Sequence, residues 1–143
     1  MIKSLQLDFL PTSAKVPVAL LVLRVWLGLA MLIQHGWGKL TGYAQMADQF
    51  PDPLGIGSHA SLALSVLAEA LCSAMLVIGL FTRIAALGLI INLSVAFLLV
   101  HGNAVTGAHS EELAFVYLGG YVALVLAGGG YVSLDASMSK TSA

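Results

Sequence analysis

Four apolar runs, each near the length of a bilayer crossing, constrain the fold of this chain more than any other feature. They comprise residues 16–40, 60–80, 84–100 and 113–130. A membrane-spanning helix needs about 20 apolar residues, and the third and fourth runs lie at the short end of the usual range. None of the runs shows the alternating polarity of a barrel strand, so each is predicted to be a helix. The predicted fold class is therefore all-α, an integral membrane four-helix bundle with up-down topology, forming a single transmembrane domain over residues 1–143.

The composition agrees with a chain that lies in lipid. Only 9% of the residues are charged, whereas soluble domains carry about 25%. The lipid bilayer is therefore the first expected partner. The net charge of −1 offers no basic surface for nucleic acid. With Cys72 as the single cysteine, no intrachain disulfide can form.

The distribution of basic residues predicts the orientation. An even number of spans places both termini on one side, together with Lys3, Lys15, Arg83 and Lys140, whereas the opposite side has only Lys39. The positive-inside rule then predicts that both termini are cytoplasmic. The first apolar run is too long for the core of a signal peptide, so no cleaved leader is expected.

Two ionisable residues interrupt the apolar runs. Arg24 lies in the first run and Glu69 in the second, where such groups normally face a protein interior and pair there. We predict an ion pair between Arg24 and Glu69. The pair either locks two helices together or serves as a proton relay or ligand anchor. Asn92 and Ser94, in the third run, are predicted to form hydrogen bonds between helices.

A second set of polar residues is predicted at the non-cytoplasmic ends of the helices. His35 lies eleven residues after Arg24, about three helical turns, and therefore on the same stripe. Imidazole and carboxylate groups can accept a proton, bind a quinol hydroxyl or ligate a metal, although interfacial histidines also simply face water. The histidine spacing fits no metal-binding motif, so no metal site is predicted. The candidate ligand-binding residues are Arg24, His35, Lys39, Glu69, His101 and Glu112.

Several short motifs, taken in order along the chain, resemble those of a known family. They are Arg24 with Gly28, His35-Gly36 and Lys39; Glu69; Gly79-x-x-Thr82-Arg83-x-Ala85-Ala86; Glu112-Leu113-Ala114; and Gly128-x-Gly130-Tyr131-x-Ser133-Leu134-Asp135. Over about residues 16–136 this set resembles the DoxX family of small bacterial four-helix membrane proteins. The resemblance is carried by the ordered set of motifs and not by any one of them.

The resemblance implies a protein of the bacterial inner membrane that works as a subunit or partner in thiol, thiosulfate–quinone or other redox systems. The positions that match the polar motif positions of the family are Arg24, His35, Lys39, Glu69, Arg83 and Glu112. The implied electron carrier is either a bound quinone or the cofactor of a partner, and the implied partner is a soluble or membrane redox protein. Whether the chain itself is an enzyme is left open by the resemblance.

Three functions follow as hypotheses. The first is a quinone-facing or membrane-anchoring subunit of an oxidoreductase system, with the quinone oxygens near His35 or Glu112. The second is a non-catalytic membrane protein that binds an assembly partner. The third is a conduit for protons or small solutes through Arg24 and Glu69, which would require a homo-oligomer because four helices leave little room for a pore.

Overall fold

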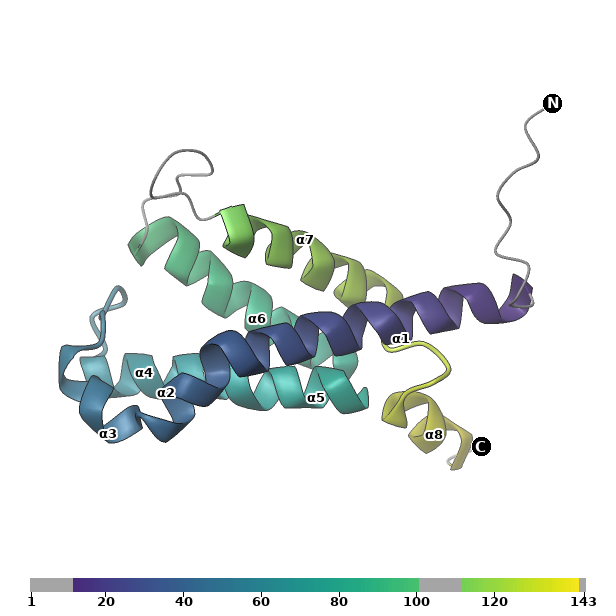
Figure 1. The fold of residues 1–143 in the computed structure, drawn as a ribbon, viewed down its shortest axis with the longest axis horizontal. Coiled ribbons are helices and arrows are strands. Elements are labelled where there is room, and N and C mark those ends of the chain that lie inside the picture. The colour runs from purple at the N-terminus through teal and green to yellow at the C-terminus, as the bar shows by residue number, and fades with distance from the viewer. Residues whose placement is uncertain (1–11, 101–111, 142–143) are drawn as a thin grey trace.

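The structure is a computed structural model that describes residues 12–100 and 112–141. Helices and the turns between them account for these residues, with no strand among them, which confirms the all-α fold class. Four helical rods lie along one another within this part of the chain, and successive rods run in opposite directions (Figure 1).

Each of the first three rods contains a π-helical turn. The first rod comprises α1 (Thr12–Met31), η1 (Leu32–Gly36) and α2 (Trp37–Thr41); the second comprises α4 (Ser58–Val66), η3 (Leu67–Cys72) and α5 (Ser73–Ile78); the third comprises α6 (Thr82–Val95) and η4 (Ala96–Val100); and the fourth is α7 (Glu112–Ala127). Because a π-turn adds a residue to the helical register, it changes which side chains face the neighbouring rod, and such turns occur frequently at functional sites.

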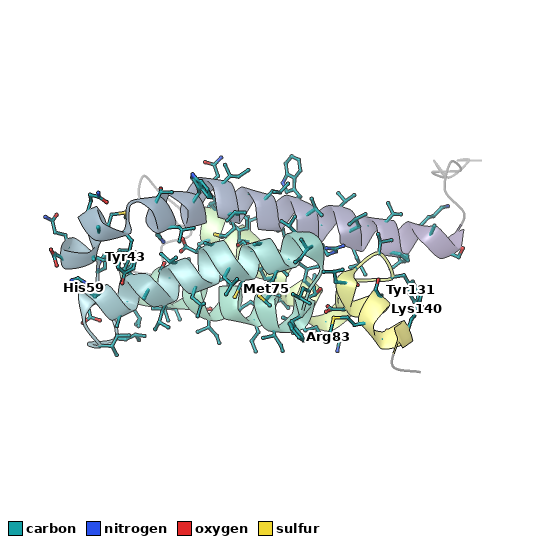
Figure 2. The ribbon with its side chains drawn as sticks, turned by 90° about the horizontal axis from the view of Figure 1, so that it is seen from below. Tyr43, His59, Met75, Arg83, Tyr131 and Lys140 are labelled. Carbon is teal, nitrogen blue, oxygen red and sulfur yellow. The ribbon has the colours of Figure 1, made fainter. Side chains whose placement is uncertain are left out.

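Shorter elements mark the two ends of the bundle. The helices α3 (Tyr43–Met46) and η2 (Ala47–Gln49) follow the first rod, and α8 (Leu134–Thr141) follows the fourth. We call these ends the α3 end and the α8 end (Figure 1). In Figure 2, Tyr43 and His59 lie at the α3 end, whereas Arg83, Tyr131 and Lys140 lie at the α8 end.

Three of the described helical stretches are long and apolar enough to cross a bilayer. They are Ser13–Thr41, Ser58–Ile78 and Thr82–Val100, while Glu112–Ala127 is a shorter apolar helix. Large apolar side chains face outward around the bundle, as Trp26 and Leu126 show with exposures of 74% each. Helices that are apolar on their outer as well as their inner faces are suited to lipid.

The core of the bundle lies between the four rods. Met31, Leu76, Leu89, Tyr121 and Leu124 are almost completely buried there, one or more from each rod. The first and second rods come especially close where η1 meets η3. A Cβ added to Gly36 would overlap the backbone of Glu69, so only glycine allows this approach. The close contact brings the residues after Gly36 within reach of the Glu69 side chain.

Candidate functional site

The carboxylate of Glu69 is the centre of a buried polar cluster in the half of the bundle nearer the α3 end. Both of its oxygens accept hydrogen bonds from Lys39 Nζ at 2.7 Å. Oε1 also accepts from Asn92 Nδ2 at 2.9 Å and from Ser65 Oγ at 3.1 Å. Lys39, Ser65, Glu69 and Asn92, here called the polar cluster, thus come from three different rods. The predicted inter-helix hydrogen bond of Asn92 is confirmed.

Lys39 connects the polar cluster to the surface. The ammonium group donates to Ser65 Oγ at 2.9 Å as well as to Glu69, and it lies 5.6 Å from the ring centroid of Phe50. The Lys39 side chain is 22% exposed, while that of Glu69 is 6% exposed. A buried carboxylate is tolerated when it is paired and hydrogen-bonded, and the ammonium group supplies that pairing from the more accessible side.

An apolar cavity of about 480 Å³ adjoins the polar cluster. All four residues of the cluster line it, and the remaining walls are mostly apolar side chains of the second and third rods and of the loop before α4. Wall residues include Leu64, Leu67, Ile91, Val95 and Ala96. A cavity of this size with apolar walls and a few convergent polar groups is typical of a small-molecule site.

The loop that precedes α4 covers one side of this cavity and is held by Asp52. The Asp52 carboxylate accepts hydrogen bonds from Ser61 Oγ and Gly57 N, each at 2.8 Å, and from Ile56 N at 3.0 Å. These donors, the Ser61 hydroxyl first, lower the pKa of Asp52 below its ordinary value. Ionised Asp52 therefore orders the loop whose Phe50 contacts Lys39.

The structure gives Arg24 a different partner from the one predicted. Its guanidinium group donates to the carbonyl oxygens of Leu76 at 2.9 Å and Val77 at 2.7 Å, and to that of Val132. The residue is only 2% exposed. The predicted ion pair between Arg24 and Glu69 is wrong, because Glu69 pairs with Lys39. The last carbonyls of α5 carry the negative end of a helix dipole and satisfy the guanidinium group instead.

Asp135 holds the turn between α5 and α6 at the end where α6 begins. Its carboxylate accepts from Phe81 N at 2.6 Å and Thr82 N at 2.9 Å, and so caps the start of α6. Between the two helices, Gly79 has φ 74°, and a Cβ there would lie 2.7 Å from Arg24 Nη1. We call Arg24, Gly79 and Asp135 the helix clamp, because they hold the turn between α5 and α6 from both sides.

The other candidate residues do not join the polar cluster. His35 lies in η1 and Glu112 begins α7; both are exposed, and neither lines the cavity. His101 lies outside the described residues. Arg83, at the start of α6, is at the α8 end and far from the cluster along the bundle. Of the five candidate ligand-binding residues that the structure describes, it brings together only Lys39 and Glu69.

The sequence alone did not indicate that Ser65 belongs to the polar cluster or that Lys39 is the partner of Glu69. Ser65 lies four residues before Glu69, a spacing that places both on one helix face and could have indicated it. The pairing of Lys39 carried no such local signal, because it depends on how closely the first two rods approach. In the described part of the chain, no group of three or more His, Cys, Asp or Glu side chains could hold a metal ion.

Comparison with known proteins places the chain in a family. The sequence model of DoxX matches residues 19–102, which include the whole polar cluster, Arg24 and Gly79. The chain belongs to the DoxX family. An uncharacterized protein of Haemophilus influenzae (strain ATCC 51907 / DSM 11121 / KW20 / Rd) is 27% identical over 128 residues, which cover 86% of this chain and 85% of that protein. No solved structure matches the chain significantly.

Family membership and the apolar helices together make this a DoxX-family membrane protein. The match begins at residue 19, within the first rod, and extends to the end of the third, so it includes the polar cluster and its cavity. Asp135, Ser133 and the preceding glycines lie beyond the matched range. The geometry of the helix clamp nevertheless explains the motifs around Gly79 and Asp135, since the two segments meet at one turn.

Proposed function

We propose that this DoxX-family protein binds a quinone or quinol in the cavity beside the polar cluster and serves as the membrane subunit of a redox system. The observation that supports this most directly is the combination of a cavity of about 480 Å³ with Lys39, Glu69 and Asn92 at one wall. A ring with two oxygen atoms needs apolar walls and a small number of polar partners, and the cavity offers both.

The chemistry of the polar cluster fits such a ligand. Lys39 and Asn92 carry N–H groups that can donate to a ring carbonyl oxygen, and the Glu69 carboxylate can accept a proton from a ring hydroxyl. A bound quinone would supply two-electron chemistry. The residues of this chain would orient the ring and hold a proton at the Glu69 oxygens, while the apolar walls exclude water from that carboxylate.

Electron transfer would require a partner. The chain has one cysteine, Cys72, and therefore no internal dithiol for redox exchange. Electrons to or from a bound quinone would pass to the cofactor of a soluble or membrane protein. In this proposal the DoxX-family chain supplies the quinone site and the membrane anchor.

The proposed location is the bacterial inner membrane with both termini in the cytoplasm. Lys15, Arg83 and Lys140 are found near the α8 end, whereas Asp48, Asp52 and Glu112 belong to segments at the other end. The positive-inside rule places the basic end in the cytoplasm. The quinone cavity would then lie nearer the outer leaflet. Labelling of single cysteines introduced at positions 45 and 139 in intact cells tests this arrangement.

A photoreactive quinone analogue, added to the protein in nanodiscs, tests the binding proposal. We expect light-dependent labelling of peptides that line the cavity, and at least tenfold weaker labelling in Glu69→Gln. Glu112→Gln makes the same chemical change on an exposed residue outside the cavity and serves as the matched control. Ala96→Phe should block the cavity without altering the polar cluster, and Ala123→Phe, on the exposed face of α7, is its control.

The outcome that contradicts the proposal is equally specific. Equal labelling of the wild type, Glu69→Gln and Ala96→Phe would show that the analogue partitions into lipid and does not occupy the cavity. If the protein binds no analogue but co-purifies with a defined protein partner, the assembly function is favoured. Proton or solute flux in liposomes that is abolished by Glu69→Gln would favour the conduit.

A further inference from the structure

We propose that the groove at the α8 end is a binding site for one acidic phospholipid. The groove has a volume of about 1020 Å³ and is formed by the start of α1, the start of α6, the glycine segment after α7, and α8. It lies at the opposite end of the bundle from the quinone cavity and shares no lining residue with it. The proposal does not rest on the proposed function.

The charge of the groove favours an anion. Arg83 and Lys140 line it, and both side chains are exposed. The Arg83 guanidinium group has five N–H donors, of which one goes to the Leu126 carbonyl at 3.2 Å. Among the described residues that line the groove, Asp135 is the only acidic one, and its two oxygens accept the backbone N–H groups of Phe81 and Thr82. A phosphate group would therefore meet two cations while the single carboxylate is already engaged.

A buried hydroxyl group provides the second observation. Thr82 lines the groove and is completely buried, yet within the described residues its Oγ1 has no hydrogen-bond partner. A buried hydroxyl without a partner is costly, and each instance needs an explanation such as a bound group. Because Oγ1 has no exposed surface in this structure, a phosphate oxygen at the wall of the groove would accept that hydrogen bond after a small shift of the glycine segment. Gly129, which packs directly against Oγ1, leaves no side chain there to do so.

The apolar wall of the groove distinguishes a lipid from free phosphate. Val16, Pro17 and Leu20 of α1 line one side, and Val16 is 67% exposed. An acyl chain could lie along this part of α1 while the phosphate group reaches Arg83 and Lys140. Tyr131, 78% exposed beside the groove, has the amphipathic ring that is enriched at membrane–water interfaces. In Figure 2, Tyr131 and Lys140 lie at this end of the molecule, and Arg83 lies in the same half of the bundle, between them and Met75.

The test compares lipids retained by the full-length protein after extraction from nanodiscs that contain equal amounts of phosphatidylglycerol and phosphatidylcholine. Native mass spectrometry should show one tightly held phosphatidylglycerol on the wild type. Each basic residue that meets the phosphate group of the lipid should contribute roughly a fivefold change in affinity, the size of one Lys or Arg contribution at an acidic membrane surface. Arg83→Gln with Lys140→Gln should therefore reduce the preference for phosphatidylglycerol about 25-fold. Lys15→Gln, at the same end but outside the lining, should leave it unchanged.

Thr82→Val separates binding from folding. The valine removes the unpartnered hydroxyl at nearly constant shape, so the thermal stability of the lipid-free protein should not fall, while retention of phosphatidylglycerol should drop several-fold. The proposal is overturned if the double variant retains the wild-type preference, or if Lys15→Gln reduces it equally. Displacement of the lipid by millimolar inorganic phosphate would also overturn it, because free phosphate would then be the occupant.

Discussion

The helix clamp and the polar cluster both bury a charged side chain, yet they satisfy it in opposite ways. Arg24 is surrounded by main-chain carbonyl oxygens at the end of α5, and its position follows from the backbone. Glu69 is surrounded by three side chains that also line a cavity. A charged side chain whose hydrogen bonds all go to backbone groups has few interactions that a ligand could replace. A site built from side chains beside open space can exchange partners, which is the property a binding site needs.

The helix clamp and the polar cluster also differ in how accessible their charged side chains are from outside the bundle. Arg24 is 2% exposed and is enclosed by the turn between α5 and α6 and by the segment before α8. Lys39 reaches Glu69 from a side chain that is 22% exposed, under a loop that the Asp52 carboxylate holds in place. We therefore expect changes in the helix clamp to affect folding and changes in the polar cluster to affect ligand binding.

The largest expected effect is that of Arg24→Met. This substitution removes the charged donor from the carbonyl oxygens of Leu76, Val77 and Val132, although the Leu76 oxygen still accepts from Gly79 N. A hydrogen bond from a charged group is worth about 1.5–3 kcal/mol. We expect a loss of about 3–5 kcal/mol in the free energy of unfolding, measured by circular dichroism in detergent. A variant that unfolds like the wild type would show that the clamp does not hold the turn.

The second largest effect on stability is expected for Glu69→Ala, which leaves the Lys39 ammonium group without its carboxylate. Because Lys39 can move toward solvent, the expected loss is smaller, about 1–3 kcal/mol in the free energy of unfolding. Replacing both partners together, Lys39→Met with Glu69→Leu, should restore most of that stability but abolish binding of the quinone analogue. Restored stability with binding intact would contradict the role assigned to the polar cluster.

Gly79→Ala should have a somewhat smaller effect on the helix clamp. Alanine disfavours the φ of 74° at this position, and its Cβ would lie 2.7 Å from Arg24 Nη1. A loss of about 1–2 kcal/mol in the free energy of unfolding is expected. Gly119→Ala is the matched control, because a Cβ at that helical glycine of α7 meets no atom within 4 Å. Equal effects of the two substitutions would rule out a special role for Gly79.

The smallest expected effect is a local change with pH at the loop that covers the cavity. The pKa of Asp52 is lowered in the folded protein, so the ionised carboxylate stabilises the loop at pH values above the unfolded pKa. That stabilisation is lost as the pH falls through the lowered pKa. The amide resonances of Ile56 and Gly57 should shift with a midpoint below the ordinary aspartate value of about 3.9. In Asp52→Asn the same resonances should not titrate.

The sequence predicts some contacts of the polar cluster well and others poorly. Asn92 was expected to bond across helices and does so with Glu69. Arg24 was expected to meet Glu69, because both interrupt apolar runs and such groups normally pair in a protein interior. That expectation considered only side chains as partners, whereas the end of α5 offered Arg24 backbone acceptors. His35 shares a helical stripe with Arg24 in an ideal helix, but the π-turn η1 lies between Met31 and Trp37 and alters that register.

The sequence by itself determined the fold class, the membrane environment and the family, because apolar length, low charge and ordered motifs are properties of the chain read in one dimension. The tertiary structure decided which charges pair and where a cavity opens. Those outcomes depend on the close approach of two rods at Gly36, on π-turns that rotate side chains, and on a turn that exposes carbonyls to Arg24. Each depends on distances between residues far apart in sequence, which no local pattern encodes.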